Sequence, residues 1–582
     1  MGVSSTPRST ASDLVGAREQ LQLPDKEVFW DRLSLGLASL GIFLVMLTFR
    51  DYGVTWDEDV HNWYGNLVLD YYLSFFHNNT ALHWRDLYNY GAVFDMMAAA
   101  LTRVSPFGVY ETRHFLNGLV GVLGLVGCWK LARAVAGARA GFIAPLFLIS
   151  TPNYYGQMFN NPKDIPFAVG VVWSTYYTVQ LARELPCPSL RLLAKLGAAI
   201  GMTLGIRIGG LLLVCYLGLV IVLDGAWRAT ATRRIRVLFY SAWLGAWRVV
   251  VPVVLVAYSV MLLFWPWAQT DPIENPLRAL AFFSHQTFPF KTLFDGQFIL
   301  ATSLPWTYLP TFVAVALPEL VLVLLLCAPI VMVFALCHAP SALRRERALP
   351  IGVVIIGIIF PVTYAIAIKA VLFDGMRHFI FVLPLISVVA AVVADRGLIW
   401  LARFRFRRTI YVALVLYGLV HVSIMTMLHP DQYVYYNAFV GGVRGAQHKF
   451  KLDYWANSYA EAVHGLEDYL RTEYGAGFEE REFTVGVCGP PVSADYYFPP
   501  NFRFLRDSAR AEFFIAFTKD DCDRSLPGRP IYRVERLRAL LSLVLDRRDH
   551  IAPRHIVGQT STGLPPDHSD GVAQPSSLRS LP

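Results

Sequence analysis

The sequence contains few charged residues for its length. Only 16% of its 582 residues are Asp, Glu, Lys or Arg, and 55% are hydrophobic. A soluble globular domain carries about 25% charged residues. The mean hydropathy is +0.43. A soluble core cannot bury so large an apolar fraction, so these values exclude a soluble multidomain enzyme and indicate a polytopic membrane protein.

Cysteine is also scarce, and its positions form no metal-binding pattern. Most of the seven cysteines lie in or beside apolar runs, and only Cys488 and Cys522 lie in a polar region. The sequence has no CxxC pair and no Cys/His spacing typical of zinc. It also lacks Gly-rich phosphate loops and Walker or Rossmann patterns. These absences exclude a disulfide-rich secreted protein, a zinc protein, and an enzyme that uses ATP or a nucleotide sugar from the cytoplasm.

Long apolar runs are what the sequence does have. A spanning helix needs about 20 mostly apolar residues. Candidate spans cover residues 33–49, 115–129, 141–155, 165–179, 208–223, 249–265, 320–336, 351–368, 379–394 and 410–427, with a shorter run at 196–206. If 196–223 crosses twice with a turn near Arg207, the pattern predicts about eleven spans. Residues 90–104 lie between two external stretches and predict an interfacial or re-entrant helix.

The loop charges predict the orientation. The formal net charge is +8, and the basic residues gather in short loops, which face the cytoplasm in membrane proteins. We therefore expect a multi-pass protein of the cell membrane (inner or plasma), with its N-terminus in the cytoplasm and its C-terminus outside. The predicted domains are a cytoplasmic segment 1–32, a transmembrane domain 33–428 with an external loop 50–114, an external α/β domain 429–552, and a disordered tail 553–582.

The polar 429–552 region has its own secondary-structure pattern. Strands are predicted at 483–487 and 513–517, and a helix is predicted at 535–545. The whole is therefore expected to be an all-α polytopic membrane protein with a small external C-terminal α/β domain.

Three adjacent acids, Asp57, Glu58 and Asp59, follow the first span. Neighbouring carboxylates repel one another and raise at least one pKa, so one of them can act as a general base. A solvated acidic turn is the plainer interpretation. A divalent-metal site is a third, since hard cations take several carboxylate oxygens.

Lys163 and Asp164 stand where the chain re-enters the membrane, between helix-breaking prolines. Lys163 can contact a phosphate there, and Asp164 can orient a sugar or a cation. Alternatively, Asp164 caps the helix that follows.

Arg207 lies among glycines between two apolar runs. An arginine at membrane depth faces a cavity or a partner, and its guanidinium suits the phosphate of a lipid carrier. The alternative is a structural ion pair with Asp57, Glu58 or Asp164. Arg377 and His378 stand at the outer mouth of the late helices, where they can clamp a second anionic group or act as ordinary interfacial anchors.

Together these motifs resemble the GT-C-fold membrane glycosyltransferases, and most of all the protein O-mannosyltransferase and lipid A aminoarabinose transferase superfamily. The resemblance rests on the acidic pair Asp57-Glu58, the interfacial helix in the same loop, Lys163-Asp164 with a proline two residues on, and the Gly-rich turn at Arg207. It is strongest over residues 33–223. Residues 432–459 are similar to a bacterial branch of the superfamily, and no external β-trefoil is evident.

The resemblance implies a role for each motif. Asp57 is then the catalytic base, Glu58 positions the acceptor, and Asp164 is the second acid at the mouth of the site. Arg207 contacts the lipid phosphate with help from Lys163, and Arg377 and His378 supply further phosphate contacts. The donor is a polyprenyl-phosphate sugar, the reaction inverts the anomeric carbon, and no cofactor or metal is expected, although Asp59 leaves a divalent metal open.

Two other classes of function stay open. One is a transporter or flippase of a lipid-linked saccharide, and the other is a non-catalytic envelope assembly protein that binds a partner through residues 429–552. Partners of the transferase are the lipid-linked donor, membrane lipids, and a lipid, glycan or protein acceptor; no nucleic acid is expected. The sequence determines neither the sugar, the acceptor, the metal dependence, the oligomeric state nor the role of the C-terminal domain.

Overall fold

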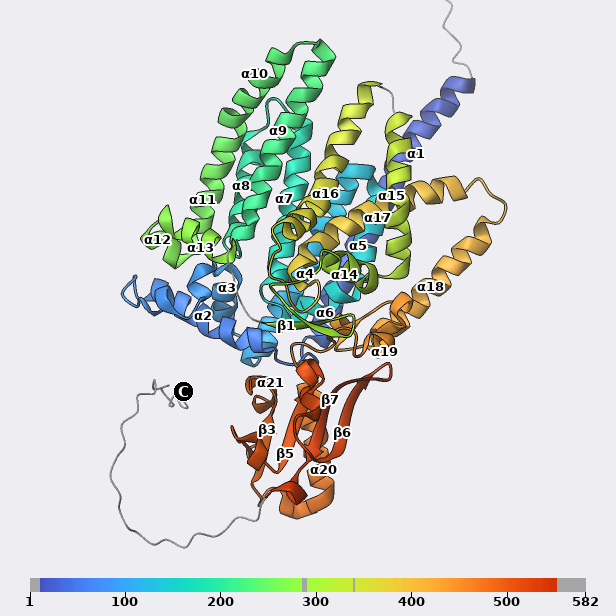
Figure 1. Cartoon of the computed structure of the whole chain (residues 1–582). Coiled ribbons are helices and arrows are strands. Elements are labelled where there is room, and N and C mark those ends of the chain that lie inside the picture. The colour runs from blue at the N-terminus through green and yellow to red at the C-terminus, as the bar shows by residue number, and fades with distance from the viewer. Residues whose placement is uncertain (1–10, 285–289, 339–340, 552–582) are drawn as a thin grey trace, which may run out of the picture.

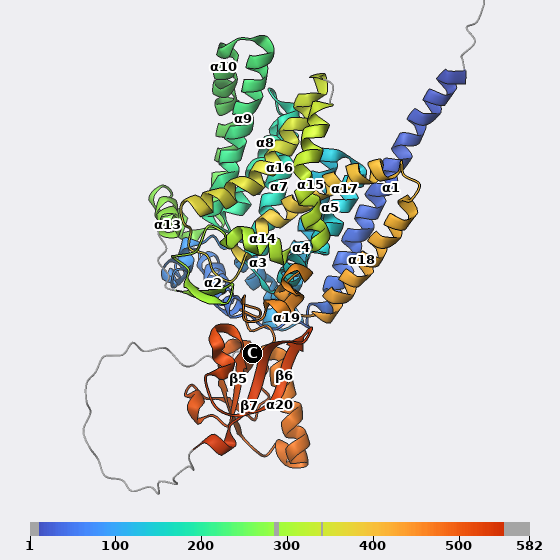
Figure 2. The same cartoon turned by 45° about the vertical axis from the view of Figure 1, so that its right-hand side comes forward.

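A computed structural model of the chain describes residues 11–284, 290–338 and 341–551. Figures 1 and 2 show a body of helices with a small sheet domain beside it. The predicted tail 553–582 lies outside the described residues.

The first part of the chain is helical. Its elements are α1 (Ala11–Thr48), α2 (Trp56–Leu73), α3 (Val93–Thr102), α4 (Val109–Ala136), α5 (Ala138–Ile149), α6 (Pro152–Asn160), α7 (Asp164–Glu184), α8 (Leu190–Leu204) and α9 (Leu211–Thr232). The predicted turn near Arg207 is confirmed, because α8 ends at Leu204 and α9 begins at Leu211. The expected helix at 90–104 is α3, whose 10 residues are too few to span a bilayer.

The second part continues with helices and one small hairpin. Its elements are α10 (Ile235–Gly245), α11 (Val251–Leu263), α12 (Pro266–Thr270), α13 (Glu274–Ser284), β1 (Lys291–Phe294), β2 (Gln297–Leu300), α14 (Tyr308–Ala316), α15 (Glu319–Cys337), α16 (Ser341–Ala367), α17 (Leu383–Leu401), α18 (Arg407–Met427) and α19 (Gly442–Ala446). A π-helical turn, Ala246–Val250, joins α10 to α11.

Seven helical stretches within the described ranges are long and apolar enough to cross a membrane. They are Lys26–Thr48, Val109–Ala136, Ile208–Thr232, Ile235–Leu263, Ala348–Ala367, Arg377–Leu401 and Arg407–Met427. Shorter apolar helices include Ala138–Ile149 and Glu319–Phe334. The chain is therefore a multi-pass membrane protein of mainly helical class, as predicted, while the count of eleven spans stays a prediction.

The C-terminal domain is a five-stranded sheet covered by a helix. Its elements are α20 (Tyr459–Tyr474), β3 (Phe483–Val487), α21 (Val492–Asp495), β4 (Phe502–Phe504), β5 (Phe513–Phe517), β6 (Arg529–Arg536) and β7 (Ala539–Asp546). The strand order is β4-β3-β5-β7-β6. Strand β3 is parallel to β4 and β5, and β7 is antiparallel to β5 and β6. The predicted small α/β domain and its two predicted strands are confirmed.

The helix predicted at 535–545 is wrong, because this segment belongs to the hairpin of β6 and β7. Leu537 and Arg538 form its turn, with φ of 50° and 67°, and positive φ at both central residues is typical of a tight hairpin turn. The apolar run of β7 suits a buried strand as well as a helix, and its pairing with β5 decides between them.

One disulfide lies in this domain. It joins Cys488, just after β3, to Cys522, which follows β5. The loop that carries Cys522 is thereby tied to the sheet, on the side of the domain where Trp56 lies against Phe517.

The elements that carry the polar motifs lie on one side of the helical body. Figures 1 and 2 place α2, α3, α6 and α19 toward the sheet domain, whereas the α9–α10 connection lies on the opposite side. Asn457 joins the two parts, since its side-chain oxygen accepts hydrogen bonds from the Gly53 N–H and the Asn160 amide, each 2.8 Å long. The polar motifs therefore meet where the helical body contacts the C-terminal domain.

Candidate functional site

The three acids in the first turn of α2 point in different directions. Glu58 is 1% exposed and accepts hydrogen bonds from the Thr55 N–H at 3.0 Å and from its hydroxyl at 3.2 Å. His114 lies 3.0 Å from the same carboxylate. Asp59 accepts a 2.8 Å hydrogen bond from the Tyr110 hydroxyl. Glu58 thus closes the helix N-terminus, and Asp57 alone of the three faces the charged cluster described next.

Asp57 forms an ion pair with Arg377. The Arg377 Nη2 lies 2.6 Å from the Asp57 carboxylate, whose side chain is 30% exposed. Burial by itself raises the pKa of Asp57, but the positive charges of Arg377 and Lys163 outweigh it and hold the pKa well below its usual range. Asp57 is therefore ionised and keeps some access to solvent.

Arg377 faces two further carboxylates. Its Nε lies 3.6 Å from Asp164 and its Nη1 lies 3.7 Å from Asp374. The guanidinium also lies over the Trp455 ring, 4.8 Å from its centroid. The sequence predicted that Arg377 either clamps an anionic group or acts as an interfacial anchor, and in the structure its neighbours are acids of the protein itself.

Asp164 is held by a second arginine. Arg207 Nη2 lies 2.5 Å from Asp164, and the Asp164 side chain is 3% exposed. Burial raises the pKa of Asp164, while Arg207 and Arg377 lower it further than burial raises it. Of the two interpretations of Arg207, the structure thus shows the ion pair with Asp164.

Asp164 does not cap α7. The Asn161 side-chain oxygen accepts the Asp164 N–H at 2.9 Å, and the Asn161 amide donates to the Asp164 carboxylate at 2.9 Å. The capping alternative is therefore wrong for Asp164, because Asp164 is the first residue of α7 after the N-cap residue Lys163, its N–H is bound by Asn161, and its carboxylate pairs with Arg207.

Lys163 stands next to this pair. Its ammonium lies 3.7 Å from the Tyr90 ring centroid, a favourable cation–π contact. Burial and the charge of Arg207 lower the pKa of Lys163 to about 7, although Asp57 and Asp164 act in the opposite direction. Lys163 therefore changes its charge near neutral pH.

His378 lies at the edge of the same group of residues. Its ring meets Phe373 at 4.7 Å between centroids. Its Nδ1 is buried and has no hydrogen-bond partner among the described residues. Six of the seven predicted site residues are thus in or next to one cluster, and Glu58 is turned away into the helix N-terminus.

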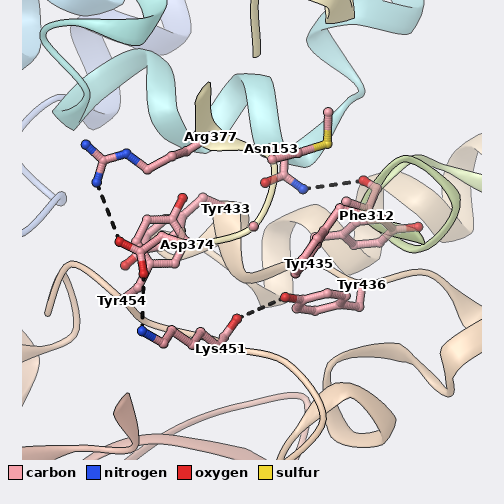
Figure 3. A pocket seen from close by; sticks show the side chains of 12 residues that line it. Asn153, Phe312, Asp374, Arg377, Tyr433, Tyr435, Tyr436, Lys451 and Tyr454 are labelled. Carbon is pink, nitrogen blue, oxygen red and sulfur yellow. Dashed lines mark hydrogen bonds and ion pairs between the residues drawn. The ribbon is translucent and has the colours of Figure 1, made fainter. Parts of the chain in front are cut away.

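The structure adds charged residues that the sequence did not single out. Lys451 lies 3.5 Å from Asp374 and 3.4 Å from Asp520 of the C-terminal domain. Lys519 of that domain lies 4.2 Å from the Trp56 ring centroid. Both lysines lie far from Asp57 in the sequence, after the helical part of the chain, so no local sequence spacing links them to it. Figure 3 shows Asp374 between Arg377 and Lys451.

A second buried polar group was also missed. His61 Nδ1 and Arg113 Nη2 each lie 2.7 Å from Asp95, one on each carboxylate oxygen. His61 stands one helical turn after Asp57, so this group braces α2 against α3 and α4 next to the site. His61 lies four residues after Asp57 on α2, on the same face of the helix, and this spacing could have drawn attention to His61.

No group of three or more His, Cys, Asp or Glu side chains suited to a metal ion is found within the described ranges. The three acids at 57–59 point apart, as shown above. The fold and the site thus define a class of protein: a multi-pass helical membrane protein with a cluster of charged residues at the ends of its helices.

Part of the chain matches a known family. Residues 93–256 match the family model "Dolichyl-phosphate-mannose-protein mannosyltransferase". The match runs from the start of α3 into the first half of α11 and includes Lys163, Asp164 and Arg207. It confirms the predicted resemblance over this segment and indicates a glycosyltransferase-type enzyme. A search of curated protein sequences gives no significant match.

Three solved structures are similar to the chain. ArnT from Cupriavidus metallidurans bound to undecaprenyl phosphate has 15% identity and a TM-score of 0.47, covering 90% of this chain and 99% of that one. The apo oligosaccharyltransferase from Archaeoglobus fulgidus has 10% identity and a TM-score of 0.41, covering 83% and 69%. The archaeal oligosaccharyltransferase AglB from the same organism, in complex with an inhibitory peptide and a dolichol-phosphate, has 13% identity and a TM-score of 0.40, covering 78% and 62%.

Proposed function

We propose that the chain transfers a sugar from a polyprenyl-phosphate donor to a lipid, glycan or protein acceptor at the outer face of the cell membrane. The proposal rests on one observation: ion pairs through Arg377 and Asp164 connect Asp57 to Arg207, a cation of the family-matched segment. Arg377 contacts Asp57 and Asp164, and Asp164 contacts Arg207. A candidate base and a group of candidate phosphate ligands thus share one cluster.

In the proposed reaction, Asp57 takes the proton of the acceptor hydroxyl. The acceptor oxygen attacks the anomeric carbon, the bond from that carbon to the lipid-phosphate oxygen breaks, and the anomeric configuration inverts. An Asp whose pKa is held low is a weak base. An anionic donor phosphate beside Lys163 and Arg377 offsets the positive charge that lowers the pKa of Asp57, so donor binding prepares the base for its task.

Lys163, Arg207 and Arg377 stabilise the leaving phosphate as its charge develops. Asp164 is a positioning residue in this scheme, since it orients both guanidinium groups. His378 adds an imidazole nitrogen without a protein partner. Glu58 shapes the α2 N-terminus, and this is a change from the acceptor-positioning role that the family resemblance implied. We propose that neither a metal nor a cofactor takes part.

A transporter or flippase of a lipid-linked saccharide is the second candidate. Charged residues at membrane depth suit it, and residues 429–552 also suit a non-catalytic assembly protein. Both alternatives tolerate the loss of a general base, and the transferase does not. Replacement of Asp57 therefore separates them.

The test compares envelope glycolipids and glycans by mass spectrometry in a deletion strain that carries wild type, Asp57→Asn or Asp70→Asn. We expect Asp57→Asn to remove the transferred sugar as the deletion does, because a general base contributes about 10²- to 10⁴-fold in rate. Asp70 is the matched control, since it lies on the same helix, is 44% exposed, and pairs with Arg103.

The variant proteins must be present at wild-type levels for this comparison. A wild-type glycan pattern with Asp57→Asn, together with an altered pattern in the deletion strain, overturns the role of Asp57 and favours the transporter or scaffold.

A further inference from the structure

A small pocket opens beside Arg377, where the helical body meets the segment before α20 (Figure 3). Its volume is about 20 Å³, which is space for a group about as large as one water molecule. Tyrosine rings form most of one wall, and Asp374, Arg377 and Lys451 supply its charged groups. The labelled lining side chains in Figure 3 also include Asn153, Phe312, Tyr433, Tyr435, Tyr436 and Tyr454.

Asp374 has an unused hydrogen-bond acceptor at this pocket. The residue is 4% exposed, and its Oδ1 makes no hydrogen bond to any described residue. The Lys451 ammonium lies 3.5 Å from this oxygen, at ion-pair distance. A buried polar atom without a hydrogen bond is costly and is uncommon away from functional sites.

The backbone holds Asp374 in an unfavourable conformation. Its φ is 55°, in the left-handed region, and Gly375 follows with a φ of 72°. The Gly375 N–H donates to the Tyr308 hydroxyl at 3.1 Å. Strain of this kind gathers at sites that bind ligands, so the unused oxygen and the strained turn point to the same place.

The charges around Asp374 limit what can bind. Burial raises the pKa of Asp374, but Lys519, Lys451 and Arg377 outweigh it and lower the pKa. These cations disfavour an amine in the pocket, and the Asp374 carboxylate disfavours an anion. A neutral hydroxyl suits both, because it donates to Asp374 and accepts from the Lys451 ammonium.

We propose that this pocket binds one hydroxyl or hydroxymethyl group of a neutral sugar and so selects the reacting carbohydrate. This inference rests on the proposed function, since Arg377 joins the pocket directly to Asp57. A sugar held by Asp374 is thereby anchored next to the proposed base.

The test measures sugar binding to the purified full-length protein in lipid nanodiscs by saturation-transfer NMR. The probe is methyl α-D-mannopyranoside, because the matched family acts on mannose, together with its monodeoxy and monoamino derivatives. We expect the parent glycoside to bind. Removing one particular hydroxyl, or replacing it with an amine, weakens binding about tenfold or more, because that hydroxyl bonds to a charged group.

Asp374→Asn is expected to weaken the binding of the parent glycoside by a similar factor, and Asp295→Asn is expected to leave it unchanged. Asp295 is a matched control, since it is exposed, has a φ of 48° and also precedes a glycine. The derivatives test the pocket in the wild-type protein, so the answer does not depend on the folding of a variant. Absence of parent binding, equal binding of all deoxy derivatives, or tighter binding of an amine overturns the proposal.

Two further arms separate the sources of the sugar and the two proposals. Polyprenyl-phosphate mannose displaces the glycoside if the pocket belongs to the donor, and leaves it bound if the pocket belongs to the acceptor. If the glycoside does not bind but Asp57-dependent sugar transfer is intact, only the proposal about the pocket is refuted. Pocket binding without Asp57-dependent transfer refutes the proposed function instead.

Discussion

At the scale of single residues, Arg377 organises the candidate site. Its side chain is 8% exposed, and burying such a charge costs several kcal/mol unless acids compensate it. Asp57, Asp164 and Asp374 supply that compensation from three separate parts of the chain. Because each acid is held by a cation, the carboxylates stay ionised and keep their directions without a ligand.

Lys163 predicts a pH dependence. Its pKa of about 7 means that it is charged below neutral pH and neutral above. If it contacts the donor phosphate, binding favours the charged form, so the donor KM rises as the pH rises from about 7, by up to tenfold per pH unit. The donor phosphate is a phosphodiester and keeps its charge over this range. Steady-state transfer kinetics from about pH 6 to pH 8 measure this.

Lys163→Arg is the control, because a guanidinium stays charged throughout this range. Its donor KM is expected to be independent of pH, and that of Lys163→Gln to be high at every pH. A rise of equal size in wild type and Lys163→Arg assigns the pH dependence to another group.

Much of the residue cluster was predictable from sequence. Asp57, Lys163, Asp164 and Arg207 stand at the ends of apolar runs, and alternation of the runs places such ends on one side of the membrane. The direction of Glu58 had a local signal, the Thr55-x-x-Glu58 spacing of a capping box, whereas its contact with His114 depends on the packing of another helix. Lys451 and Lys519 were missed because only the packing of the C-terminal domain brings them near Asp374.

At the scale of elements, the site depends on the close approach of two loops. A Cβ at Gly91 would lie 2.1 Å from the backbone oxygen of Gly205, which no side-chain movement can relieve. Gly91 precedes α3, and Gly205 begins the turn that carries Arg207. Only glycine at position 91 lets this turn lie against the external loop.

Gly91→Ala is therefore expected to destabilise the protein by about 1–3 kcal/mol, as overpacking in a close-packed interior does. It should also lower sugar transfer, because the turn that orients Arg207 moves. Thermal unfolding in detergent and the glycan assay measure the two effects. Gly218→Ala is the control, since a Cβ there meets nothing within 4 Å; equal unfolding temperatures of the two variants contradict the argument.

Secondary structure was predicted correctly where local hydropathy determines it, and wrongly where pairing between distant strands determines it. Two short helices meeting near Arg207 were expected, because the alternation of basic and external loops closes only if 196–223 crosses twice; the turn is present, but α9 has 22 residues and is longer than expected. The run 535–545 begins with Glu535, Arg536 and Arg538 and continues as the mainly apolar stretch 539–545, whose length and composition suit a strand as well as a helix. Its assignment as part of a hairpin comes from the ladder between β5, β7 and β6.

At the scale of the whole molecule, the C-terminal domain is joined to the site by buried polar contacts. Arg536 of β6 lies 2.9 Å from Asp431, and Asp431 accepts a 2.6 Å hydrogen bond from Asn457. Asn457 in turn accepts from Gly53, before α2. Burial raises the pKa of Asp431 to about 7 even though Arg536 acts against it. The domain is thus fastened to the loop that presents Asp57.

The disulfide predicts on which side of the membrane this domain lies. Disulfides persist in oxidising compartments and are rare in the cytoplasm, so the Cys488–Cys522 bond predicts an external C-terminal domain, as the loop charges do. A membrane-impermeant maleimide applied to spheroplasts should label Cys488 and Cys522 only after reduction. Cys187, exposed in a basic loop, should be labelled only after permeabilisation.

Variants that retain either the Cys488–Cys522 pair or Cys187 alone make the labelling specific. Labelling of Cys187 in sealed spheroplasts reverses the orientation and places the site in the cytoplasm. The bond closes a loop with a sequence separation of 34, for which chain entropy gives about 4 kcal/mol of stabilisation. Loss of both cysteines is therefore expected to loosen the loop that bears Lys519.

The sequence by itself determined that the chain is a multi-pass membrane protein, where its main helices lie, and which polar residues stand at their ends. These properties follow from local hydropathy and charge, which need no long-range contact. The tertiary structure alone decided the partners of each charge: Arg377 with Asp57, Arg207 with Asp164, and Lys451 with Asp374. The pairs span up to 320 residues, and at that separation only packing in three dimensions selects which charges meet.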